Sequence, residues 1–127
     1  KRDTRIILCR SGNVDVSVPS CGGDVQVWSS GYIVFADDGN YTNDVYDAGT
    51  DELLRVGRAT ANGVNLRTNS TWNRNLEFNP DGSTNEGGAL ATMSICDDRG
   101  KPEGRQIQVS PNGIPKLFAK NIASCYP

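Results

Sequence analysis

The chain has 127 residues, a formal net charge of −2 and no histidine. This length fits one domain with a modest core. The absence of histidine excludes a Ser–His–Asp or Cys–His catalytic site and removes the commonest metal ligand, and the acidic balance gives no overall drive to bind nucleic acid.

Short apolar runs separated by turn residues follow one another along the chain. The runs cover residues 6–9, 14–18, 25–36, 53–56, 64–66, 76–78, 91–96, 107–109 and 114–119. Their dominant period is two, as in β-strands, and no stretch keeps a helical period. The pattern predicts a mainly β, β-sandwich-like fold of short antiparallel strands, with a single domain over residues 1–127.

The run 25–36 is unusual because it is apolar on both faces. One face carries Val25, Val27, Ile33 and Phe35, and the other carries Trp28, Tyr32 and Val34. A strand of this kind needs cover on both sides. We expect either a fully buried central strand of a sandwich or a second cover supplied by a helix or partner from outside this chain.

Asn62-Gly63 is the strongest hairpin signal in the sequence. It lies between residues 56–60 and 64–67. The pattern predicts that these two segments pair directly, with Val64 and Leu66 facing Leu54 and Val56 across the turn.

The cysteines are Cys9, Cys21, Cys96 and Cys125. No pair has the spacing of a zinc site or a redox motif. Their even number and wide spacing indicate two disulfides in an oxidising compartment, with four free thiols in a cytosolic protein as the alternative. Of the three connectivities we favour the more local one, Cys9–Cys21 and Cys96–Cys125, in which each bridge would contribute about 3 kcal/mol.

An acidic stretch follows the apolar run 25–36 and contains Asp37, Asp38, Asp44, Asp47, Asp51 and Glu52. Its glycine and glutamate positions do not fit a calcium loop of the EF-hand type. An irregular calcium site built from Asp37, Asp44 and Asp47 is an alternative, as is a carboxylate pair for glycoside hydrolysis. We predict instead a solvated connection between two strands, with no metal and no cofactor.

The start of the chain carries no membrane or targeting signal. No apolar run approaches the roughly 20 residues of a membrane helix, and no signal peptide is present. The first residues are Lys1-Arg2-Asp3, without an initial methionine. We interpret the sequence as a mature or truncated fragment.

Several short motifs occur in an order that resembles the soluble domain of the GspH/FimT/FimU family of type IV minor pilins and pseudopilins. The motifs are Arg5-Ile6-Ile7-Leu8-Cys9, Trp28-Ser29-Ser30-Gly31-Tyr32-Ile33-Val34-Phe35-Ala36-Asp37-Asp38-Gly39-Asn40, Asp51-Glu52-Leu53-Leu54-Arg55, Gly63-Val64-Asn65-Leu66-Arg67, Leu76-Glu77-Phe78-Asn79-Pro80-Asp81-Gly82-Ser83, Met93-Ser94-Ile95-Cys96, Arg105-Gln106-Ile107-Gln108-Val109-Ser110-Pro111-Asn112-Gly113 and the terminal Cys125. The resemblance covers nearly the whole chain.

The resemblance implies a non-enzymatic protein that is α+β at full length. Its N-terminal apolar helix is processed by a prepilin peptidase, methylated, anchored in the bacterial inner membrane and later packed in the pilus. Its β-rich head lies in the periplasm. The partners implied are other minor pilins and the major pilin, and the helix would supply the missing cover of the doubly apolar strand.

Within this family, the DNA-binding FimT-type members resemble one another in a basic Gly-Arg-x-Arg motif. The matching place here reads Gly113-Ile114-Pro115-Lys116, so both arginines are absent and DNA contact would fall to Lys116 and Lys120. A basic patch would also need Arg58 and Arg67 to meet Lys116. We expect a FimU-type minor pilin that primes pilus assembly near the tip. The alternatives are a FimT-type DNA-binding pilin, a GspH-type secretion pseudopilin and, outside the family, a calcium-dependent adhesin or small hydrolase.

Overall fold

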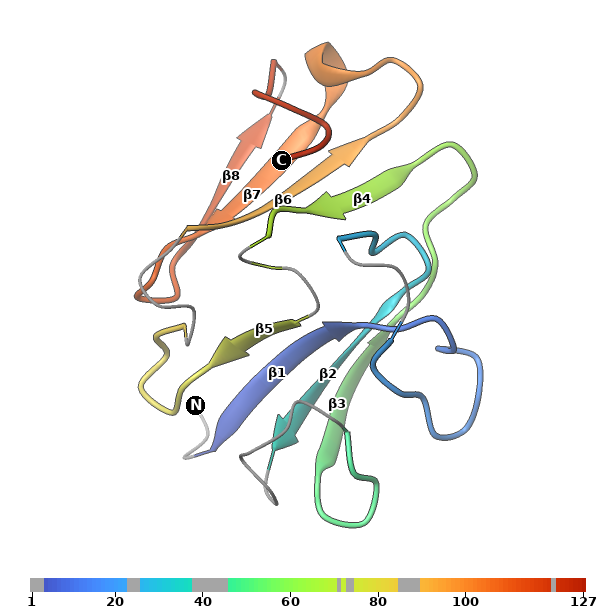
Figure 1. Cartoon of the computed structure of the whole chain (residues 1–127), viewed down its shortest axis with the longest axis vertical. Coiled ribbons are helices and arrows are strands. Elements are labelled where there is room, and N and C mark those ends of the chain that lie inside the picture. Colours follow the sequence, from blue (N-terminus) through green and yellow to red (C-terminus); the bar gives the residue numbers. More distant parts are fainter. Residues whose placement is uncertain are drawn as a thin grey trace.

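In the part of the chain that the structure describes, eight short strands form two four-stranded antiparallel sheets, drawn as two layers in Figure 1. The computed structural model describes residues 4–22, 26–37, 46–70, 72, 75–84, 90–119 and 121–127. The first sheet has the order β3 (Glu52–Gly57), β2 (Tyr32–Asp37), β1 (Arg5–Arg10) and β5 (Asn75–Phe78). The second has the order β4 (Asn65–Thr68), β6 (Ala91–Cys96), β7 (Arg105–Val109) and β8 (Pro115–Ala119). The prediction of a β-sandwich-like fold is confirmed.

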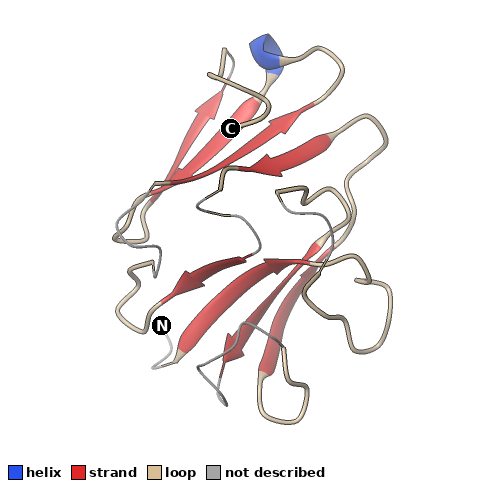
Figure 2. Ribbon diagram, viewed as in Figure 1, coloured by secondary structure: helices blue, strands red, loops and turns tan. Residues whose placement is uncertain are grey.

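Helical structure in the described residues is limited to the 3₁₀ turn η1 (Lys101–Glu103), the only blue segment in Figure 2. Across these residues no helix is long and apolar enough to cross a membrane. The strands therefore carry the fold.

The outer face of the first sheet is apolar and is covered by loops. Ile7 lies opposite Phe35 on the neighbouring strand, and both side chains are fully buried. They pack in a cluster with Val14 from the loop after β1 and Tyr46 from the segment before β3. The Phe35 and Tyr46 rings lie 5.4 Å apart between centroids. One side of β2 thus receives its cover from loop residues of this same chain.

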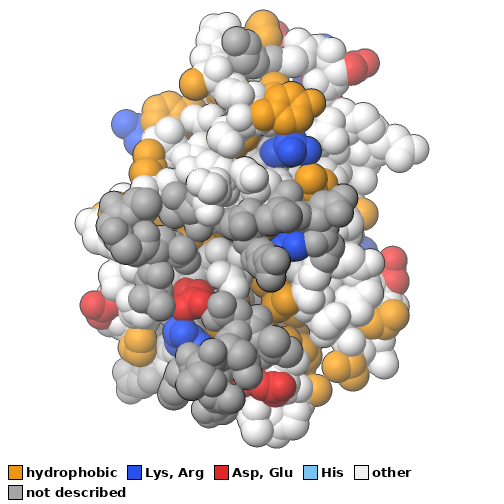
Figure 3. Space-filling view, viewed as in Figure 1, with side chains coloured by type: hydrophobic (Ala, Val, Ile, Leu, Met, Phe, Trp, Pro, Cys, Tyr) orange, Lys and Arg blue, Asp and Glu red, His pale blue; other side chains and the backbone are white. Residues whose placement is uncertain are grey.

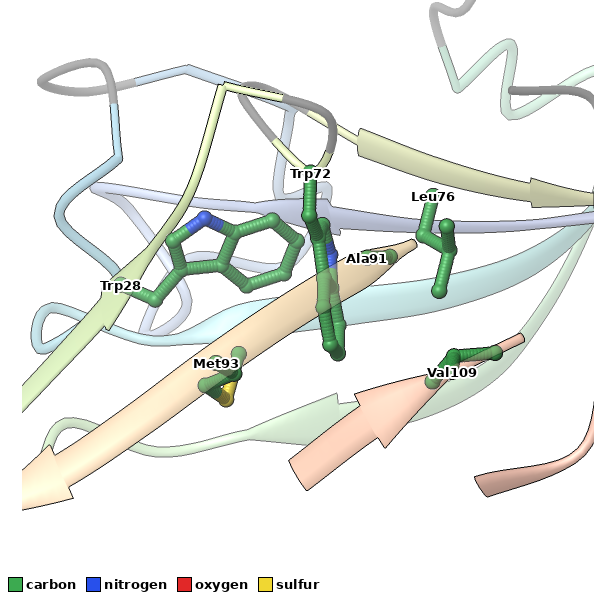
Figure 4. Close-up of a cluster of buried hydrophobic side chains, with 6 residues drawn as sticks. All are labelled: Trp28, Trp72, Leu76, Ala91, Met93 and Val109. Atoms are coloured by element: carbon green, nitrogen blue, oxygen red, sulfur yellow. The ribbon is translucent and has the colours of Figure 1, made fainter. Parts of the chain in front are cut away.

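The inner face of the first sheet meets the second sheet in a separate core. Its buried members are Trp28, Trp72, Leu76, Ala91, Met93 and Val109. In Figure 4, Trp72 lies between Trp28 and Leu76. The two indoles pack edge to face, with ring centroids 5.4 Å apart, a favourable arrangement for aromatic pairs.

The expected strand 25–36 is wrong in its extent. Only Tyr32–Asp37 forms β2, and Val25 lies outside the described residues. Val27 instead makes an isolated bridge to Arg67, on the edge strand of the second sheet. The chain turns between these two parts at Gly31, whose φ of 130° favours glycine. The apolar run therefore serves both sheets.

The expected hairpin at Asn62-Gly63 is also wrong. The turn forms, because the Val64 N–H donates to the Ala61 carbonyl (3.1 Å) and Gly63 has a φ of 83°. However, β3 pairs with β2 whereas β4 pairs with β6, so the turn joins the two sheets. The Thr60 N–H donates to the Ser29 carbonyl (2.9 Å). It is therefore not available to pair with the segment that follows the turn.

The apolar run 14–18 does not form a strand, contrary to expectation. Val14 is buried, but Val16 and Val18 are 51% and 56% exposed. The Asn13 side chain organises this loop, because its Oδ1 accepts from the Ser20 N–H (2.9 Å). A side chain thereby replaces the backbone ladder that a strand would need.

Two disulfides tie the loops to the sheets, with the more local connectivity. Cys9 on β1 is bonded to Cys21, and Cys96 on β6 is bonded to Cys125. The second bridge holds the C-terminal segment against the outer face of the second sheet, where the Ser94 hydroxyl donates to the Ser124 carbonyl (2.7 Å).

Candidate functional site: an apolar groove between the sheets

An open cavity of about 410 Å³ lies between the two sheets, next to the tryptophan pair. It falls within the size range of ligand-binding clefts. Of its described lining residues, only Arg55 carries a charge. The lining is Leu8, Trp28, Tyr32, Val34, Arg55, Leu66, Trp72, Met93, Ile95 and Ile107, which we call the groove.

The first sheet supplies one wall of the groove through strand alternation. Leu8 on β1 lies opposite Val34 on β2, which lies opposite Arg55 on β3. Because neighbours in register share a face, these three side chains point to the same side of the sheet. Leu8 and Val34 are only half-buried although both are apolar. This wall is therefore incompletely covered.

The second sheet supplies the facing wall by the same rule. Leu66 lies opposite Ile95, and Met93 lies opposite Ile107. The row continues to Leu117 on β8, which lies opposite Ile107 and is 64% exposed. The apolar surface thus runs from the groove to the free edge of this sheet. Contiguous exposed apolar surface of this kind often marks a site where another molecule or segment binds.

The tryptophans line the groove with apolar ring surface, whereas their indole nitrogens are buried. Trp28 and Trp72 are 1% and 4% exposed. Each indole Nε1–H is buried and has no hydrogen-bond partner among the described residues. A buried donor without an acceptor costs free energy, and tryptophan N–H groups usually find a partner when buried. Neither nitrogen reaches the groove surface, so the tryptophans offer an occupant only their apolar ring surface.

The acidic stretch does not converge on a metal site in the described residues. Asp37 pairs with Arg5, which also pairs with Glu77, at 2.5 and 3.0 Å. Asp47 and Asp51 bond to each other within a turn, where the Asp47 N–H donates to the Asp51 carboxylate (2.9 Å). Asp38 and Asp44 lie outside the described residues. Over the described part of the chain, no three His, Cys, Asp or Glu residues gather as metal ligands would.

The structure does not bring Arg58, Arg67 and Lys116 together. Arg58 forms an ion pair with Asp15 beside the first sheet. Arg67 is on β4 with its guanidinium over the Tyr126 ring, and Lys116 is on β8 with its ammonium over the Phe118 ring. Since β4 and β8 are the two edges of the second sheet, about 14 Å separates them.

Lys120, the other expected DNA contact, lies outside the described residues. On the molecular face in Figure 3, the coloured lysine and arginine side chains also lie apart from one another. The basic patch that a DNA-binding reading would need therefore does not form among the described residues.

A second, polar cavity of about 200 Å³ lies at the end of β6. Asp97 and Arg99 line it and form a side-chain pair, with Arg99 Nη2 2.7 Å from Asp97 Oδ2. Hydrogen bonds from the Arg99 side chain and backbone hold the pKa of Asp97 below its usual value. Its other charged lining residues are Glu103, which lies 4.0 Å from Arg99, and Arg105, so charges of both signs are mixed in this cavity.

Comparison with known proteins decides the family. The family model described as type II transport protein GspH matches residues 1–113. The chain belongs to the GspH family. No curated protein matches it.

The GspH-family chain also has the fold of a known minor pilin. Two crystal forms of the type IV minor pilin FimU from Pseudomonas aeruginosa superpose with TM-scores of 0.66 each, at 17% and 19% identity. Each match covers 98% of this chain, and 82% and 78% of the FimU chains. The expectation of a FimU-like head is confirmed at the level of the fold.

Sequence reasoning found part of this GspH-family groove. It identified Trp28, Tyr32 and Val34 as one apolar face in need of cover, and the structure places all three in the groove. It missed Trp72 and Met93. The signal was present for Met93, because β6 is apolar at alternate positions, but alternation does not say which neighbouring surface a face meets.

Proposed function

We propose that this protein is a FimU-type minor pilin that takes part in type IV pilus assembly, in the priming complex near the pilus tip. The groove carries this proposal, because it leaves an apolar surface half-open in a head of FimU fold. Its role is structural and involves no catalysis. Its partners are other minor pilins and the major pilin.

An N-terminal apolar helix preceding Lys1 fills the groove in this proposal. The same helix anchors the protein in the inner membrane before assembly, with the head in the periplasm. Leu8 and Val34 would then become buried, as apolar side chains on two adjacent strands usually are. The two disulfides support an oxidising compartment such as the periplasm.

The ion pairs of several arginines favour the FimU type over the DNA-binding FimT type. Arg5, Arg58 and Arg99 are engaged with carboxylates. Strong DNA binding depends on lysines and arginines that are available to phosphates. A disulfide that ties down the C-terminus favours FimU over a GspH-type secretion pseudopilin, because this arrangement resembles FimU-like members.

The test is the N-terminal sequence and intact mass of the native protein, extracted from the membranes of its source bacterium. We expect about 20 apolar residues before Lys1, behind a processed and methylated N-terminus. The same protein should appear in sheared pili together with other minor pilins. A mature chain that starts near Lys1 would overturn the pilin proposal, and absence from pili would point to a secretion system.

A further inference from the structure

Arg55 differs from the other described residues of the groove because it is charged. Its neighbours across the strands and sheets are apolar, yet it is a permanent cation. None of the ion pairs in the described residues includes it. The contrast is Arg58, three positions later, which pairs with Asp15. Arg55 is thus a solvent-exposed charged group on the groove wall that has no counter-ion among the described residues.

The position of Arg55 ties its charge to whatever fills the groove. It lies opposite Val34 on the face that carries Leu8. A helix packed against Leu8 and Val34 would cover the aliphatic stem of Arg55 and remove water from its guanidinium. Burying a charge without a partner is costly, whereas a carboxylate at hydrogen-bond distance compensates for it.

We propose that the segment that fills the groove carries an acidic side chain that pairs with Arg55. This rests on the proposed function, in which the segment is the N-terminal helix of the same protein. The helix then docks in one register, because its carboxylate must meet Arg55 while its apolar face meets Leu8, Val34 and Ile107. An apolar stripe alone would allow it to slide or rotate. Charged pairs fix register and orientation more than they add affinity.

The test compares the native protein with the chain of residues 1–127, each as wild type, Arg55→Gln and Arg55→Glu. Arg58→Gln is the matched control, because it removes a nearby guanidinium whose partner, Asp15, is present in both forms. The first readout is the pair of indole N–H signals in a ¹H–¹⁵N spectrum. The chain has two tryptophans, and both line the groove, so these signals report its occupancy. The second readout is the melting temperature.

We expect the indole signals to differ between the native protein and residues 1–127. Arg55→Gln should lower the melting temperature of the native protein by about 3 to 5 °C more than that of residues 1–127. Arg55→Glu should lower it further, because it repels the carboxylate. Arg58→Gln should lower both forms equally. Replacing the acidic residue of the helix by arginine should restore the Arg55→Glu protein, as coupled residues do in a double-mutant cycle.

Two results separate the inference from the proposed function. If the indole signals are the same in both forms, the groove is not filled by a segment of this protein, and the proposed function fails with the inference. If the signals differ but Arg55→Gln has equal effects in both forms, the groove is filled while Arg55 stays in water. The inference is then wrong and the proposed function stands.

Discussion

Replacing Arg5 with methionine should be among the most damaging single substitutions of a charged residue in this fold. Arg5 begins β1 and lies between two carboxylates, Asp37 at the end of β2 and Glu77 on β5. It therefore joins three adjacent strands of the first sheet. The three side chains are only 12%, 1% and 10% exposed.

The magnitude follows from burial. Removing one partner of a buried ion pair typically costs about 3–5 kcal/mol, because a charge is left without compensation. Arg5→Met leaves two nearby buried carboxylates of the same sign, Asp37 and Glu77, so the upper half of this range applies. For a chain of this size the cost corresponds to a melting temperature about 12 to 20 °C lower. Asp37→Asn should cost less, because Arg5 keeps its pair with Glu77.

The assay is urea unfolding followed by tryptophan fluorescence, since both tryptophans lie in the core between the sheets. Arg58→Met is the control. Its ion pair with Asp15 is 74% and 82% exposed, and pairs of this kind contribute about 0–1 kcal/mol. The reasoning is refuted if Arg5→Met is no more destabilising than Arg58→Met.

The two disulfides span 12 and 29 residues, so the chain-entropy model gives them about 3 and about 4 kcal/mol. Reduction should therefore lower the melting temperature markedly, and equal melting with and without reductant, with thiol alkylation as the check, would contradict this. The depressed pKa of Asp97 predicts a small stabilising contribution that is complete above its ordinary pKa and is lost as pH falls through the folded-state pKa. In an NMR titration of the Asp97 carboxyl group, Arg99→Gln should raise the midpoint toward the ordinary value, and an unchanged midpoint would show that Arg99 is not the cause.

Two turns with nearly the same glycine geometry have different outcomes, for a reason that lies outside the turns. Pro111-Asn112-Gly113 joins β7 to β8, with Gly113 at a φ of 82°. Gly63 has nearly the same φ of 83°, yet β4 pairs with β6 and not with β3. A turn residue fixes the local backbone direction. Whether the flanking strands then pair depends on which other strand is available, and this information is not local.

The loop after β1 shows that alternation of apolar and polar residues does not by itself produce a strand. The run 14–18 alternates like a strand, but a strand also needs a neighbour with free backbone groups. Here β1 is already paired on both sides, with β2 and β5, so no place remains beside it. The disulfide Cys9–Cys21 closes the segment as a loop. Of the three valines in this run, Val14 reaches the core, and the pattern could not show that Val16 and Val18 remain outside.

The groove could not be predicted from the sequence, because it depends on the distance between the two sheets. The apolar run 25–36 correctly indicated that β2 needs cover on both faces. On the outer face Val14 and Tyr46 supply it, so no external helix is required there. On the inner face the tryptophan pair and Leu76 fill one part of the space, and the remaining 410 Å³ beside them stays open. Periodicity tells which side chains share a face, but the width left between two faces is set by the bulk of residues far apart in the sequence. The open space therefore depends on how the two sheets pack around Trp28 and Trp72, and not on the doubly apolar strand alone.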